Sequence, residues 1–255
     1  VIVNSAGFKE VGREGEKLEI EILENAKKHG IRIFGPNCQG VINSDPRSKA
    51  YCNFTFTKPI EGHISIVSQS GGVGEILNQR FSELGMGVRM YASNGNACDI
   101  SIPEIIEYWA KDEKTRVIVL YIESMSNKKH FMEILKKISC IKPILAMIAG
   151  RTKEGAKAAS SHTGSLAKQE ITTELLFEKA GVLTFRDEEE LCQAAVAFST
   201  QPIPRGRRVG LLTNTGGPAV IATDELVYRG LEIPHLSIYS RSKLKKILHP
   251  AASPH

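Results

Sequence analysis

The chain has 255 residues, and 33 Lys or Arg against 28 Asp or Glu give it a formal net charge of +5. Its 42% hydrophobic and 24% charged residues are typical of one or two globular domains and exclude a disordered chain, a collagen and a simple coiled coil. The modest positive excess, with only 6% aromatic residues, argues against a nucleic-acid partner and is compatible with a small anionic ligand.

Helix and strand patterns alternate along the chain. Apolar positions at helical spacing predict a helix over 15–29 that ends at Gly30, and a short strand follows at 31–34. Residues 35–40 are rich in turn formers and 45–62 show no periodicity, which predicts a loop and then a linker or an irregular edge. The other expected strands are 1–4, 63–67, 88–91, 117–122, 143–148 and 208–212. The other expected helices are 75–84, 103–110, 129–138, 170–180, 188–198 and 219–228.

This alternation predicts an α/β fold with doubly wound parallel sheets. The continuous apolar run at 117–122 is typical of a strand that is buried on both faces of such a sheet. The segment QPIPRG at 201–206 has two prolines and a glycine between a helix and a strand, so we expect a linker there.

Several kinds of site and compartment are disfavoured. No apolar stretch approaches the ~20 residues that span a bilayer, so we expect no membrane partner. The cysteines are Cys38, Cys52, Cys98, Cys140 and Cys192. They are widely spaced, odd in number and without a CxxC pair, which argues against a disulfide framework or a metal site and favours a cytoplasmic location.

The chain begins like the inside of a strand and stops without a terminal element, so we interpret it as a fragment.

Two strand-to-helix turns repeat one pattern 145 positions apart: SQSGG at 68–72 and TNTGG at 213–217. A helix N-terminus offers unsatisfied N–H groups and a partial positive charge, and glycines let an anion approach the backbone. Ser70 or Thr215 could add a hydroxyl donor. A tight turn with a hydroxyl cap explains a single such loop equally well, but two matched loops favour one anion held between two helix ends. Neither loop is a P-loop or a GxGxxG motif.

His162 is the histidine best suited to carry a covalently attached group, because AASSHTGSL at 158–166 surrounds it with small residues. A lone histidine is more often structural, so this pattern does not decide its role. Glu123 directly follows the apolar strand, at the carboxyl end where ligands bind in open α/β sheets. A carboxylate there could fix the tautomer of an imidazole, or it could cap the following turn.

Four motifs in order resemble the nucleoside-diphosphate-forming acyl-CoA synthetases of the succinyl-CoA synthetase superfamily. They are GPNCQG at 35–40, VSQSGGV at 67–73, GRTK at 150–153 with SSHTGSLA at 160–167, and TNTGGP at 213–218. The resemblance implies flavodoxin-like CoA-ligase domains and a reversible conversion of acyl-CoA, ADP and phosphate into a carboxylic acid, CoA and ATP. The reaction would pass through an acyl phosphate and a phosphorylated histidine.

The resemblance also implies roles for individual residues. His162 would be the phosphorylated histidine, and Glu123 the glutamate that orients it. The implied phosphate-holding residues are Ser70, Gly71 and Gly72 in the first loop and Thr215, Gly216 and Gly217 in the second. Asn37 and Cys38 resemble the segment near the thiol end of CoA, where we expect Cys38 to line the pocket without a catalytic role.

The resemblance divides the chain into three parts. Residues 1–60 would be the rear of a Rossmann-like CoA-binding domain plus a linker, without that domain's glycine-rich first turn. Residues 61–201 would be a flavodoxin-like CoA-ligase domain with the phosphohistidine loop, and 202–255 the incomplete start of a second one. We expect ADP or ATP and Mg²⁺ to bind to ATP-grasp domains outside this chain, on a partner subunit or another stretch. Lys168 stands where a glycine is common in the family.

Two other functions remain alternatives. One is a non-catalytic module that senses CoA or acyl-CoA in an acetyltransferase fusion, but a sensor has no need of a phosphorylatable side chain such as His162. The other is a flavodoxin-like nucleotide-binding domain, which leaves the paired Gly-Gly loops unexplained.

Overall fold

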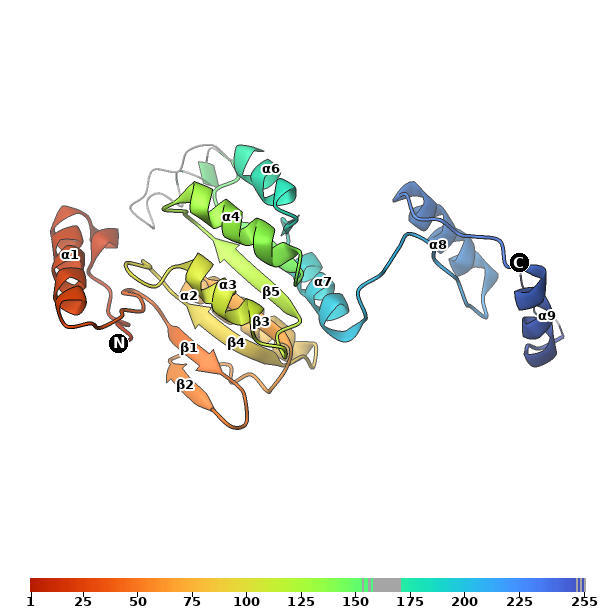
Figure 1. Ribbon diagram of the computed structural model, residues 1–255, viewed down its shortest axis with the longest axis horizontal. Helices are drawn as coiled ribbons and strands as arrows, with labels where there is room; N and C mark the ends of the chain where they lie inside the picture. Colours follow the sequence, from red (N-terminus) through yellow and green to blue (C-terminus); the bar gives the residue numbers. More distant parts are fainter. Residues whose placement is uncertain (153, 156, 158–170, 251, 253, 255) are drawn as a thin grey trace. The chain divides into compact units, whose positions relative to one another are not determined.

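The computed structural model describes residues 1–152, 154–155, 157, 171–250, 252 and 254 (Figure 1). The chain divides into two compact units, which we call unit 1 (Val1–Gln201) and unit 2 (Pro202–His255). The division falls at the start of the segment with two prolines. Among the helices that the structure describes, none combines the length and apolar character needed to cross a bilayer.

Unit 1 contains a seven-stranded sheet. Its strands are β1 (Gly40–Asn43), β2 (Ala50–Asn53), β3 (Ile64–Ser68), β4 (Val88–Ser93), β5 (Val117–Ile122), β6 (Ile144–Ile148) and β7 (Leu183–Phe185). Their order is β2-β1-β4-β3-β5-β6-β7, in which β3 to β7 pair in parallel and β1 is antiparallel to both of its neighbours. The parallel part has the order of a flavodoxin-like sheet, which confirms the predicted α/β class.

Helices cover both faces of this sheet (Figure 1). The helices of unit 1 are α1 (Arg13–Lys28), α2 (Gly71–Glu83), α3 (Ile102–Ala110), α4 (Lys128–Ser139), α6 (Ile171–Lys179) and α7 (Glu188–Thr200), with a 3-10 turn at Lys9–Val11. One buried cluster joins the sheet to α3, α4 and α6, and a second joins it to α2 and α7. Two apolar layers therefore enclose the parallel strands.

β5 shows how the sequence produces both layers. Val117 and Val119 belong to the cluster with α2 and α7, whereas Ile118, Leu120 and Ile122 belong to the cluster with α3 and α4. Successive side chains of a strand point to opposite faces, so a continuous apolar run fills both layers. All five side chains are buried, as expected for a central strand.

The segments without a clear pattern differ from expectation. Residues 1–4 and 31–34 form only the isolated parallel bridge between Ile2 and Phe34. Strands β1 and β2 were not expected, and they pair with each other in an antiparallel way. Gly40 in β1 has a φ of 100°, and a Cβ at Gly40 would lie 2.1 Å from the carbonyl oxygen of Cys52 in β2. Only glycine fits this close approach of two strands.

Unit 2 contains helices α8 (Gly216–Tyr228) and α9 (Ile238–Ile247). The expected strand at 208–212 is reduced to a parallel bridge between Arg208 and Glu232. Helix α9 was not expected, and Ser237 caps it by accepting a hydrogen bond from the Ser240 N–H at 3.1 Å. None of the described residues of unit 2 is buried, so the described part of this unit forms no buried core.

Candidate functional site

The strand order identifies the edge of the sheet where a ligand is expected. The connection from β3 through α2 leads to β4 on one side, and the chain then crosses through α3 to β5 on the other side. Open α/β sheets bind ligands at the carboxyl ends of the strands where the direction reverses. Here those ends are Ser68 of β3 and Ile122 of β5, followed by Gln69 and Glu123.

A polar cavity of about 920 Å³ opens at this edge. Gln69 and Glu123 line it, together with Asn37 from the N-terminal segment. Gly12, Ser101 and Asn127, the residues that precede the first residues of α1, α3 and α4, line it as well. Because helix N-termini attract negative charge, the cavity suits an anionic or phosphate-bearing ligand.

The N-terminal segment is held at this cavity by the loop after β4. Asn96 Nδ2 donates hydrogen bonds to Glu10 Oε2 at 2.6 Å and Glu19 Oε2 at 2.8 Å. Lys9 forms an ion pair with Glu19 at 3.4 Å and also lines the cavity. Asn37, with a φ of 54°, donates to Asn96 Oδ1 at 3.3 Å. The cavity wall is therefore built jointly by residues that are far apart in the sequence.

The first glycine-rich loop starts α2 four residues earlier than expected. Ser70 Oγ accepts a hydrogen bond from the Val73 N–H at 3.3 Å, which caps the helix. A Cβ at Gly71 would lie 2.8 Å from Gln39 Cγ, whereas one at Gly72 would have no neighbour closer than Ser70 Oγ at 4.0 Å. The hydroxyl cap thus exists, and open space remains at the first turn of the helix.

The second loop repeats the first one in structure as well as in sequence. Ser68 Oγ donates to the Ser70 carbonyl at 2.5 Å, and Thr213 Oγ1 donates to the Thr215 carbonyl at 3.1 Å. The two helices that follow, α2 and α8, have equal lengths of 13 residues. Thr215, however, makes no side-chain cap, and no atom would lie within 4 Å of a Cβ at Gly216 or Gly217.

Glu123 is half-buried and lines the polar cavity. Its backbone N–H and that of Ser124 donate to Gln69 Oε1 at 2.5 and 2.8 Å, and Gln69 Nε2 donates to the Ser124 carbonyl at 3.0 Å. The helix that follows is capped by Asn127, whose Oδ1 accepts from the His130 N–H at 3.2 Å. Asn127 therefore supplies the cap of α4, and Glu123 belongs to the cavity wall.

The described lining of the cavity contains Asn37 but not Cys38. The Cys38 side chain is buried, and its thiol donates a hydrogen bond to the Val3 carbonyl at 3.4 Å. Burial raises the pKa of this thiol to about 11, so that it stays protonated at neutral pH. A protonated thiol is a poor nucleophile, which agrees with the expectation that Cys38 has no catalytic role.

Some predicted residues are not brought to this cavity. Ser70, Gly71 and Gly72 lie beside it without lining it, and the second loop belongs to unit 2. His162 lies outside the described residues.

Sequence reasoning missed other residues of the cavity wall, among them Gln69, Ser101 and His130. In the sequence, Gln69 stands out only as part of the repeated turn, and no motif includes Ser101 or His130. The available signal was position: Gln69 follows a central strand directly, and the other two lie within three residues of a helix start.

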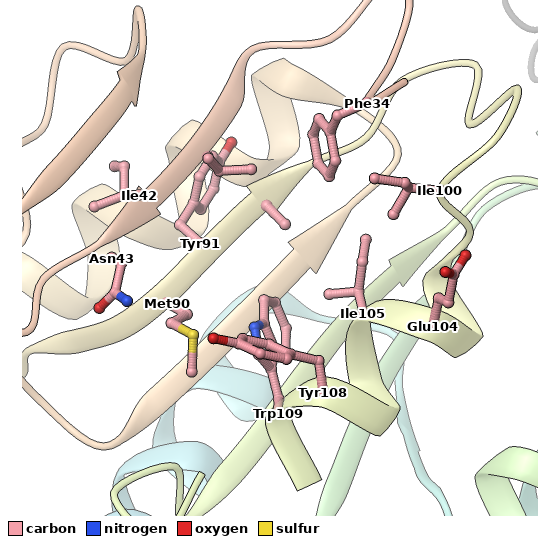
Figure 2. A pocket seen from close by; sticks show the side chains of 12 residues that line it. Phe34, Ile42, Asn43, Met90, Tyr91, Ile100, Glu104, Ile105, Tyr108 and Trp109 are labelled. Carbon is pink, nitrogen blue, oxygen red and sulfur yellow. The ribbon is translucent and has the colours of Figure 1, made fainter. Parts of the chain in front are cut away.

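A second cavity, of about 350 Å³, is apolar (Figure 2). It lies between β1, β4 and α3, with Phe34, Ile105 and Trp109 in its wall. Its charged residue, Glu104, forms an ion pair with Arg32 at 2.9 Å. Because it lacks convergent polar groups, this cavity is a weaker candidate for chemistry than the polar one.

Comparison with known proteins identifies the family. A family model described as the succinyl-CoA ligase-like flavodoxin domain matches residues 61–198, more than half of the chain. Acetate–CoA ligase [ADP-forming] II subunit alpha of Pyrococcus furiosus is 38% identical over 254 residues, which cover 99% of this chain and 54% of that protein. Acetate–CoA ligase [ADP-forming] of Methanocaldococcus jannaschii is 40% identical over 254 residues, covering 99% of this chain and 35% of the relative.

A solved structure is similar over the same range. It is the dinucleotide-forming acetyl-coenzyme A synthetase 1 of Ca. Korarchaeum cryptofilum in complex with phosphate and ADP, with a TM-score of 0.88 and 32% identity over 99% of this chain and 54% of that one. The chain thus spans between about a third and a half of the length of these relatives. The match over residues 61–198 shows that the chain belongs to the succinyl-CoA ligase-like flavodoxin-domain family, as the motifs predict.

Proposed function

We propose that this chain is the CoA-ligase and phosphohistidine part of an ADP-forming acyl-CoA synthetase. The enzyme would interconvert acyl-CoA, ADP and phosphate with a carboxylic acid, CoA and ATP. The observation that carries the proposal is the polar cavity at the switch point of the family's flavodoxin-like sheet, with Glu123 in its wall. The curated relatives are named as ligases, which supports this function over a sensing module.

The reaction proceeds in three steps. A phosphate oxygen attacks the thioester carbonyl, the C–S bond breaks, and CoA leaves as the acyl phosphate forms. An imidazole nitrogen of His162 then attacks phosphorus and releases the carboxylate, while Glu123 holds the imidazole in the reactive tautomer. The phosphoryl group finally moves from His162 to ADP, which yields ATP.

The remaining site residues bind and orient phosphate and CoA. Ser70, Gly71 and Gly72 form a helix start that holds phosphate, and Thr215, Gly216 and Gly217 form another. Asn37 and Cys38 belong to the segment near the thiol end of CoA. The support for Asn37 is its position in the wall of the polar cavity.

The proposal also assigns each part of the chain to a domain of the enzyme. Residues 1–60 are the rear of a Rossmann-like CoA-binding domain, 61–201 a CoA-ligase domain and 202–255 the start of a second one. ADP or ATP and Mg²⁺ bind to ATP-grasp domains on a partner subunit or another stretch of the protein, which fits the partial coverage of the relatives. A cytoplasmic location fits the five free cysteines.

Phosphate labelling of the full-length enzyme tests this function. Incubation with γ-³²P-ATP is expected to give an acid-labile, base-stable label, which His162→Ala abolishes. His29→Ala is the matched control, because His29 is exposed at the end of α1, and it is expected to label like the wild type. Equal labelling of His162→Ala and wild type would remove His162 from the nucleophile role.

A further inference from the structure

We infer that Gln69 is a positioning residue that holds Glu123 in the wall of the polar cavity. The inference rests on the proposed function, because it assigns Gln69 an effect on catalysis through Glu123. The two residues follow β3 and β5, adjacent parallel strands of the sheet. Gln69 therefore reaches Glu123 across the sheet, from a part of the chain 54 residues away.

The contact extends the pairing of β3 and β5 beyond its last backbone step. Ser68 pairs with Tyr121, and the Gln69 N–H donates to the Tyr121 carbonyl at 3.2 Å. Beyond this backbone hydrogen bond, the Gln69 side chain makes the contacts with the residues that follow β5. Its Oε1 accepts from the Glu123 and Ser124 N–H groups, and its Nε2 donates to the Ser124 carbonyl. Nε2 also donates, at 3.5 Å, to Ser124 Oγ, so that one amide makes four hydrogen bonds to two consecutive residues.

These hydrogen bonds act where the secondary structure ends. β5 stops at Ile122, whose carbonyl accepts from the Ala149 N–H at 2.8 Å, and α4 begins at Lys128. Between these points, the direction of the Glu123 side chain depends on the backbone angles of a short connecting loop. Gln69 restrains those angles by binding both N–H groups at once, and so it sets the direction in which the Glu123 side chain leaves the backbone.

The second loop of the repeat shows that the turn itself has no need of this long amide. Asn214, one methylene shorter, stands at the position that matches Gln69. Its Oδ1 accepts a hydrogen bond from Thr215 Oγ1 at 3.1 Å, within its own loop. The turn geometry is retained there, as the matching Thr213–Thr215 hydrogen bond shows. The extra reach of Gln69 therefore serves its contact with Glu123.

A double-mutant cycle in the full-length enzyme tests the inference. Gln69→Asn keeps a residue that the second loop accommodates but withdraws the amide from Glu123. It is expected to lower kcat by about 10- to 100-fold with little change in KM for ADP, because misplacing a catalytic group by about 1 Å has an effect of this size. In a Glu123→Gln background the same substitution is expected to change kcat by less than about 3-fold, because Gln69 acts through Glu123.

Two further variants keep the test decisive. Gln69→Met has the same length without hydrogen-bonding groups, and it is expected to behave like Gln69→Asn. Gln79→Asn is the matched control, because Gln79 is exposed on α2 and its Nε2 donates to Glu83 Oε1 of the same helix at 2.9 Å. It is expected to leave kcat unchanged. Hydrogen exchange should increase at residues 123–127 in both Gln69 variants and nowhere in the control.

The outcomes separate this inference from the proposed function. If Glu123→Gln loses activity while both Gln69 variants keep wild-type kcat, the inference is overturned and the proposed function stands. Equal losses from Gln69→Asn in the wild-type and Glu123→Gln backgrounds would also overturn it, since a merely structural effect is independent of Glu123. If Glu123→Gln itself retains full activity and full phosphate labelling, the role of Glu123 in the proposed function fails.

Discussion

The two glycines that open α2 are constrained by different neighbours. A side chain at Gly71 would collide with Gln39, whose Oε1 already accepts a hydrogen bond from the Tyr91 hydroxyl at 2.6 Å. A side chain at Gly72 would enter open space beside the helix start. Gly71 is therefore a packing residue, whereas the missing side chain of Gly72 leaves room for a ligand.

Gly72→Val is expected to reduce phosphate labelling of the full-length enzyme by at least about 10-fold, because its methyl groups occupy the space through which an anion approaches the backbone. Its thermal unfolding temperature should stay near that of the wild type. Gly71→Val is the contrasting variant, and overpacking against Gln39 should lower its stability by about 1–3 kcal/mol. Normal labelling of Gly72→Val would mean that the loop is only a turn.

At the scale of elements, the repeat of strand, turn and helix differs in one detail. The N-cap of α2 is Ser70, which bonds the Val73 N–H, whereas Thr215 at the N-cap of α8 makes no such bond. The same sequence pattern therefore produces the same turn in both units but a side-chain cap in only one of them. An N-cap hydrogen bond satisfies an N–H group that the helix itself leaves without a partner.

Ser70→Ala is expected to lower the free energy of unfolding by about 1 kcal/mol, the usual loss on removing an N-cap side chain. Thr215→Ala, the matched variant in the second loop, should change the free energy of unfolding by less than about 0.5 kcal/mol. Urea denaturation followed by circular dichroism measures both. Equal destabilisation by the two substitutions would contradict the difference in capping.

Over the whole chain, apolar burial is distributed unevenly. Unit 1 has two buried clusters on opposite faces of its sheet, but none of the described residues of unit 2 is buried. Leu212, Tyr228 and Ile238 in unit 2 are about 90% exposed, although they are large and apolar. Without buried apolar surface, little opposes the conformational entropy of the chain.

Residues 202–255 expressed alone are therefore expected to be largely unfolded, with a far-UV circular dichroism signal that changes gradually on heating. Residues 1–201 should keep the cooperative thermal transition of the 255-residue chain, because both buried clusters lie within them. A sharp unfolding transition of the isolated 202–255 segment would show that it has a core of its own.

The fold was predictable where the sequence pattern is local. β5 has the expected bounds, because a run of six apolar residues is enough to identify a strand buried on both faces. β2 was missed because none of its residues is buried and they show no alternation, so that only its pairing with β1 makes it a strand. Pairing depends on long-range contacts, which no short stretch of sequence contains.

The candidate site was predictable only in part, for the same reason. The sequence alone determined the α/β class, the repeated turns at Ser70 and Thr215, and the position of Glu123 directly after a central strand. The tertiary structure decided that the Gln69 side chain accepts a hydrogen bond from the Glu123 backbone and that Asn37 lines the same cavity as these two residues. Parallel strands bring loops from distant parts of the chain to one edge of a sheet, and which loops meet there depends on the strand order, a property of the whole fold.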